Sequence, residues 1–113
     1  MLQDLEQAIG ITFPEGTRLV RYERVTGSDA LVRAKLVFTP SQWAEFIRGR
    51  FDASTFEEEQ RYLLGTNVDW WNPRDPKHLP TAQIRLPEAK VLDVGVDRSN
   101  PKEFLVFLVW HGT

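Results

Sequence analysis

Strict alternation of apolar and polar residues marks one segment in the first third of the chain. Between residues 30 and 39 the even positions from Val32 to Phe38 are apolar, whereas the odd positions include Arg33 and Lys35. A period of two is typical of a β-strand with one buried and one polar face. The sequence therefore predicts a strand over residues 30–39.

The segment before this strand, residues 17–25, alternates less regularly. Val20 and Tyr22 are placed to face the core, and the charged residues next to them belong on the other side. The turn at residues 26–29 contains a glycine, which suits a backbone of positive φ. We therefore expect the two strands to form a β-hairpin.

Apolar residues at helical spacing predict helices at two further places. The first helix runs from Leu2 to Ile9 and ends at Gly10, which suits a left-handed cap. Another helix is expected to begin near Ser54 and to end at Gly65. Its first turn is rich in acids, which the positive end of a helix dipole stabilises.

The helix that follows Thr39 has the clearest local signal. Thr39 and Gln42 have the spacing of a capping box, and Pro40 occupies the first helical position, where no N–H donor is needed. Phe38 and Trp43 occupy the two positions of a hydrophobic staple. This combination predicts a helix that starts sharply and reaches Gly49.

Residues 66–80 contain three prolines and show no sustained period, so we expect a long loop. Three strands are predicted after it, over residues 81–86, 90–97 and 103–111. In the second of these strands, the even positions from Leu92 to Val96 face the core and Asp93 faces outward.

The last strand differs from the others because it is apolar at every position from Phe104 to Trp110. Both of its faces therefore need cover. Helices can cover one face, which leaves Phe107 and its neighbours of the same parity on the other. The loop over residues 66–80 is the expected cover, and a helix or another subunit is the alternative. If the loop does not cover this face, the sequence predicts a homodimer through it.

These elements define an α+β class: a single globular domain over residues 1–113 with a mostly antiparallel sheet of about five strands and two to three helices. The expected order is helix, two strands, two helices, three strands. A more strongly curved sheet that wraps the central helix is the alternative architecture.

Composition excludes several classes of function. The 113 residues carry a net charge of −2, without the basic excess that is usual in nucleic-acid-binding proteins. They include no cysteine, which excludes disulfides, thiolate catalysis, zinc ribbons and iron–sulfur clusters. The acidic N-terminus does not resemble a signal peptide, and no segment approaches the roughly 20 apolar residues of a membrane span. We therefore expect a soluble, cytoplasmic protein that contacts neither nucleic acid nor membrane; a leader removed from a longer chain would change the location.

The predicted loop carries the main candidate for a binding site. Adjacent tryptophans in an extended backbone point in opposite directions, so one can pack inward while the other stays at the surface. Large aromatic side chains are favoured at interface hot spots and in ligand pockets. The alternative is that both simply cover the sheet. The candidate binding residues are Trp70, Trp71, Asn72, Arg74 and His78.

Two groups of charged residues are candidate interaction surfaces. An acidic surface is expected around the central helices, where it could meet a basic partner, although helix-terminal charge explains it as well. It consists of Glu45, Asp52, Glu57, Glu58 and Glu59. A second set shares the outer face of the sheet, where we expect cross-strand ion pairing rather than a basic platform. Its cations are Arg21, Arg33, Lys35 and Arg85.

Catalytic and metal-binding patterns do not occur in the sequence. The two histidines, His78 and His111, lack the spacing of a zinc site, and no phosphate-binding glycine loop or nucleophile motif is present. We therefore expect no catalytic residue, no metal and no cofactor. An enzyme that uses either histidine would need a carboxylate within hydrogen-bond reach of the imidazole.

The layout of several short motifs resembles a diffuse group of small uncharacterised bacterial proteins, some with lipoprotein leaders. The motifs are Ile11-Thr12-Phe13-Pro14, Thr39-Pro40 followed by Trp43 to Ile47, Trp70-Trp71-x-Pro73, and a closing apolar strand that ends in Trp110. The group has no established activity, so the resemblance implies no functional residue. The 113 residues include no cysteine for lipid attachment, so we do not expect the leader of some members or their envelope location.

The sequence as a whole favours a non-enzymatic protein-interaction module, such as an immunity or inhibitor protein. The alternative is a small-ligand-binding domain with an aromatic pocket near Trp70 and Trp71.

Overall fold

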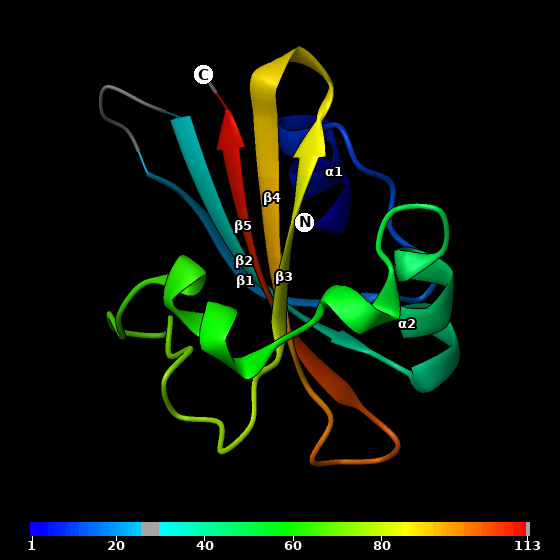
Figure 1. Cartoon of the computed structure of the whole chain (residues 1–113). Coiled ribbons are helices and arrows are strands. Elements are labelled where there is room, and N and C mark those ends of the chain that lie inside the picture. Colours follow the sequence, from blue (N-terminus) through cyan, green and yellow to red (C-terminus); the bar gives the residue numbers. More distant parts are fainter. Residues whose placement is uncertain (26–29, 113) are drawn as a thin grey trace.

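Five antiparallel strands form one sheet in the order β1-β2-β5-β4-β3 (Figure 1). The computed structural model describes residues 1–25 and 30–112, so the turn predicted at residues 26–29 lies outside the described residues. The strands are β1 (Arg18–Val25), β2 (Ala30–Phe38), β3 (Thr81–Leu86), β4 (Lys90–Asp97) and β5 (Phe104–Gly112). The helical elements are α1 (Leu2–Ile9), α2 (Pro40–Ile47) and the 3-10 helices η1 (Ala53–Thr55), η2 (Glu58–Leu64) and η3 (Pro87–Ala89). The predicted α+β class, the antiparallel sheet and the order of elements are confirmed.

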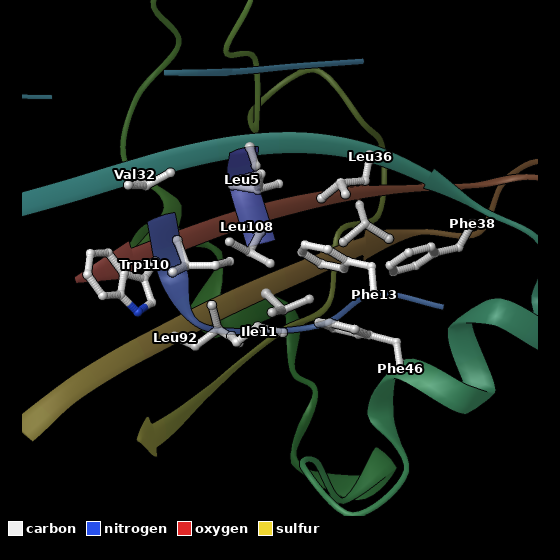
Figure 2. Close-up of a cluster of buried hydrophobic side chains, with 14 of the residues drawn as sticks. Leu5, Ile11, Phe13, Val32, Leu36, Phe38, Phe46, Leu92, Leu108 and Trp110 are labelled. Carbon is white, nitrogen blue, oxygen red and sulfur yellow. The ribbon is translucent and has the colours of Figure 1, made fainter. Parts of the chain in front are cut away.

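The larger core lies between one face of the sheet and the helices α1 and α2 (Figure 2). Alternate residues of β2, β4 and β5 point into it, as their period-two patterns predict. Aromatic rings fill the space beside α2, where Phe13 stacks on Phe46 with ring centroids 5.6 Å apart. We call this side of the sheet the helix face.

Both predicted helix ends are confirmed. Helix α1 ends at Gly10, which has the left-handed φ of 71°. Helix α2 begins with the predicted capping box: Thr39 Oγ1 accepts a hydrogen bond from the Gln42 N–H at 3.2 Å, and Gln42 Oε1 accepts one from the Thr39 N–H at 2.8 Å. The Phe38 and Trp43 rings meet at 6.2 Å, as expected for a staple.

The predicted inward position of Val20 is wrong. Leu19 pairs with Leu36 and Arg21 pairs with Lys35, so Val20 is an extra residue in β1. Such a β-bulge shifts the parity of the strand by one. Leu19 and Tyr22 therefore pack against the core, and the Val20 side chain is 55% exposed.

The helix predicted to start near Ser54 is also different from expectation. The segment forms the short helices η1 and η2, both of the 3-10 type, because it has to pass from one face of the sheet to the other. Phe56 packs against Trp43 on the helix face, at 5.5 Å between ring centroids. Glu57 then pairs with Thr81 at the edge of the sheet, and Leu64 packs on the opposite face.

The opposite face of the sheet, which we call the loop face, is covered in part by η2 and by the loop over residues 66–80 (Figure 1). Trp71 is fully buried there and meets Phe107 edge-on, with ring centroids 5.3 Å apart. Val109 is buried as well. The loop and η2 thus cover Phe107 and Val109, as expected, whereas Leu105 is only partly buried.

Candidate functional site

Trp71 holds the loop onto the sheet. Its indole Nε1 donates a hydrogen bond to the Leu64 carbonyl oxygen at 2.9 Å, which joins the loop to the end of η2. Val68 and Trp71 also exchange two backbone hydrogen bonds, of 2.8 and 2.9 Å. The one polar group of the ring, the indole N–H, is thus satisfied in the interior, so Trp71 belongs to the core of the loop face rather than to a binding surface.

Trp70 is half-buried at the margin of the same core, where its ring meets that of Trp71 edge-on with ring centroids 5.8 Å apart. The expected extended backbone is wrong here, because residues 69 and 70 form a tight turn in which Asp69 has a φ of 52°. The Lys35 ammonium donates to the Trp70 carbonyl oxygen and to Asn72 Oδ1. Burial lowers the pKa of Lys35, and the nearby Asp75 carboxylate opposes that shift. Arg21 lies over the Trp70 ring at 5.2 Å from its centroid. The side chains of Trp70 and Asn72 are therefore engaged with cations of the chain itself.

Arg74 and His78 line two separate hollows. The Arg74 N–H donates to Asn67 Oδ1, and its exposed side chain lies beside a hollow of about 300 Å³ that Tyr62 also lines. His78 lies beside a different hollow of about 340 Å³. Neither Trp70 nor Trp71 lines either of these two hollows, so among the described residues Arg74 and His78 lie in surroundings different from those of the tryptophans.

The hollow beside His78 lies where the end of β4 meets the end of the loop. Its lining combines cations, carboxylates, one hydroxyl and apolar residues, namely Glu58, Lys77, His78, Pro80, Val96, Asp97, Arg98 and Ser99. Glu58 is the best-held of these groups: its Oε1 accepts from Arg61 Nη2 at 2.9 Å and from the Leu79 N–H at 3.1 Å. Its Oε2 lies 3.6 Å from His78 Nδ1.

A second cluster of polar side chains lies on the part of the loop face that the loop does not cover. His111 Nε2 is 2.9 Å from Asp93 Oδ2, and Gln83 Nε2 donates to Asp93 Oδ1 at 2.7 Å. Burial raises the pKa of the Asp93 carboxyl, and the hydrogen bonds from Gln83 and His111 oppose that rise. The prediction that Asp93 faces outward is correct in parity, but its side chain is 1% exposed rather than solvated.

Cross-strand pairing explains this group. Register places Val109 beside Asp93 and Asp93 beside Gln83, while Val91 pairs with His111 on the next row. Alternation along β4 puts Asp93 on the loop face, but only the alignment of β4 with β5 brings His111 to it. No motif in the sequence marks that alignment.

Each histidine therefore has the nearby carboxylate that acid–base chemistry would need, but they differ in geometry. His111 is held by a hydrogen bond to a buried acid, whereas the distance from His78 to Glu58 exceeds hydrogen-bond length. Within the described ranges, no three His, Cys, Asp or Glu side chains gather in a way that could hold a metal ion.

The acidic residues do not form one uniform surface. Asp52 caps η1 by accepting from the Ser54 N–H and hydroxyl, and these bonds lower the pKa of Asp52. Glu58 belongs to the hollow beside His78, whereas Glu45 and Glu59 are exposed. The backbone of Glu57 pairs with β3.

The cations predicted on the outer face of the sheet lie on the loop face, and one of them shows the expected cross-strand pairing. Arg33 Nη1 lies 3.2 Å from Glu23 Oε1, across β1 and β2. Lys35 instead binds the loop, as described above, and Arg85 is exposed.

No family model, no curated protein and no solved structure matches this chain. The resemblance noted in the sequence therefore adds no function to the site. In the part of the chain that the structure describes, no helix is long and apolar enough to cross a membrane.

Proposed function

We propose that the protein is a non-enzymatic binding module that holds a small molecule in the hollow beside His78. The observation that carries this proposal is the combination of size and lining in one place. A volume of about 340 Å³ falls within the roughly 300–1,000 Å³ typical of small-ligand sites. Such sites pair apolar surface with a few convergent polar groups, and Pro80 lies here beside both cations and carboxylates.

The hollow is held in shape before any ligand arrives. Arg61 joins its two sides, because Nη1 donates to the Pro76 carbonyl oxygen at 2.7 Å and Nη2 donates to Glu58. The Val96 N–H donates to the Pro80 carbonyl oxygen at 3.1 Å, which fixes the loop to β4. A preformed site loses less conformational entropy on binding, which favours affinity.

The geometry of His78 supports binding rather than catalysis. Its side chain is 74% exposed, and no hydrogen bond to Glu58 fixes the orientation of the ring. A general base is normally oriented by a partner at about 2.6–3.2 Å. We therefore assign His78 a role in contacting ligand, with no proton transfer.

The test is a fragment titration followed by two-dimensional ¹H–¹⁵N NMR of the full chain. Neutral, anionic and cationic aromatic fragments of similar size are added separately. Binding in the hollow should shift the backbone amides of His78, Val96 and Ser99, and should leave those of Tyr62 and Gly65 beside the Arg74 hollow unchanged. If no fragment shifts the first group at millimolar concentration, the proposal is wrong.

A second candidate function is a protein-interaction module, supported by the uncovered part of the loop face. One row of side chains crosses all five strands there: Val25, Leu31, His111, Val91 and Arg85. Apolar side chains flank a polar centre in this row, and Arg85 is in no ion pair with a described residue. This row fits a partner protein that presents apolar side chains next to a carboxylate.

The interaction candidate is tested with a partner captured from an extract of the source cells and then purified. Binding of that purified partner should be lost in Leu31→Asp and kept in Glu59→Lys, which alters the acidic surface. The reverse pattern would assign the interaction to the acidic residues instead, and equal binding by both variants would exclude both surfaces.

A further inference from the structure

The cations beside the hollow have fewer internal partners than its carboxylates. Lys77 and Arg98 are exposed and take part in no ion pair with a described residue. Both therefore have free donors that can turn toward a ligand. Arg98 is also positioned, because its guanidinium carbon lies 5.7 Å from the Trp43 ring centroid and 5.6 Å from that of Phe104. Because stacking on the two rings already restricts the side chain, Arg98 loses less conformational freedom when it binds an anion.

Each of the two carboxylates of the hollow accepts a hydrogen bond within the fold through one of its oxygens. Glu58 accepts hydrogen bonds from the Arg61 guanidinium and from the Leu79 N–H. Asp97 Oδ1 accepts from the Ser99 N–H at 2.9 Å, at the start of the turn between β4 and β5. One oxygen of each carboxylate is thus engaged within the fold, whereas Lys77 and Arg98 have no ion-pair partner among the described residues.

We infer, resting on the proposed function, that the ligand of this hollow is a small organic anion. Its carboxylate or phosphate group would be bound by Lys77 and Arg98, and its apolar part would lie against Pro80. The planar fork of Arg98 suits two oxygens of one anionic group, whereas the ammonium of Lys77 acts as a point charge. His78, at the same rim, can donate to the same group.

The experiment compares four aromatic probes that differ mainly in charge: benzoate, phenyl phosphate, benzamide and benzamidine. Affinities are measured from the amide shifts of the 113-residue chain at low ionic strength. The anions should bind at least about tenfold more tightly than benzamide, and benzamidine should bind most weakly, since one well-placed charged hydrogen bond is worth roughly that factor. The ratio of phenyl phosphate to benzoate affinity distinguishes the two anionic groups.

Three variants test the assignment of residues. Lys77→Gln and Arg98→Gln should each weaken benzoate binding about three- to tenfold and leave benzamide binding nearly unchanged. Arg98→Lys should recover part of the loss, because it keeps the charge. Arg74→Gln is the matched control: it removes an exposed arginine of the other hollow and should change nothing.

The outcomes separate the two proposals. If all four probes bind the hollow with similar affinity, or if Lys77→Gln and Arg98→Gln bind benzoate as the parent does, the site exists but the inference of an anion is wrong. If none of the probes shifts the hollow's amides, the proposed function itself fails.

Discussion

Replacing Trp71 with alanine should lower the free energy of unfolding by about 3–5 kcal/mol, the usual range for a large core aromatic. The ring is fully buried between the loop and Phe107. An aromatic side chain of this kind buries about 150–250 Å², which corresponds to roughly 4–6 kcal/mol at about 25 cal/mol per Å². The lost hydrogen bond leaves the Leu64 carbonyl oxygen without its indole donor, which adds to the destabilisation.

Trp70→Ala is the matched control, because it changes the same residue type one position away. Trp70 is only half-buried: it lies at the margin of the loop-face core, against Trp71, and it also contacts Arg21 and Lys35. Its replacement should cost less than about 2 kcal/mol, since less area is lost and the neighbouring cations stay in contact with water. The two variants therefore compare the loss of a fully buried indole with the loss of a half-buried one.

The assay is equilibrium unfolding in urea, followed by far-ultraviolet circular dichroism so that the loss of a tryptophan does not remove the signal. The midpoint should fall much further for Trp71→Ala than for Trp70→Ala, with both transitions remaining cooperative. Equal losses, or a loss below about 1 kcal/mol for Trp71→Ala, would refute the idea that Trp71 fixes the loop to the sheet.

Three further predictions test other parts of the structure. Gly95→Ala should destabilise the protein by about 1–3 kcal/mol in urea unfolding, because an added Cβ would lie 2.7 Å from Leu64 Cδ1; an unchanged midpoint would mean that η2 does not lie so close to β4. Leu19→Ala should lower the free energy of unfolding more than Val20→Ala in the same assay, since the bulge turns Val20 outward. The opposite order would mean that Val20, and not Leu19, packs inward. Burial raises the pKa of Asp93 above 3.8, so the folded state keeps this proton longer than the unfolded state, and stability conferred by Asp93 is lost as the pH rises from 3.8 through the folded pKa. The unfolding free energy of Asp93→Asn should therefore lack this decline, and parallel pH profiles for the parent and the variant would contradict the raised pKa.

Much of the fold follows from local patterns in the sequence. Alternation places β2 and β4, and the capping box at Thr39 places the start of α2. The continuous apolar run of β5 correctly predicts a central strand covered on both faces. These features depend on neighbours within a few positions, so periodicity and residue type are enough to find them.

What the sequence does not reveal depends on register and on packing between distant segments. The bulge at Val20 shifts parity without a glycine or proline to mark it. Asp93 follows the period of a solvated residue, but Val109, Gln83 and His111 lie against it once the strands are aligned. Acidic residues near position 57 resemble a helix start, although the chain there has to cross the sheet edge.

The candidate site shows the same division. The predicted loop contains one buried and one half-buried tryptophan, and its candidate binding residues lie in different surroundings in the fold. His78 lies near Glu58 because Arg61 and the Leu79 N–H tie η2 to the end of the loop. A hollow built from the ends of three segments leaves no compact motif in the sequence, so Lys77 and Arg98 were not among the predicted binding residues.

The nuclear Overhauser effect between the Trp71 indole and the Phe107 ring is the most direct measurement of how this sheet is covered. With ring centroids 5.3 Å apart, cross-peaks between the two rings should be strong, and the Trp71 indole N–H should exchange slowly with solvent. Absent cross-peaks together with a rapidly exchanging indole N–H would show that the loop does not cover β5.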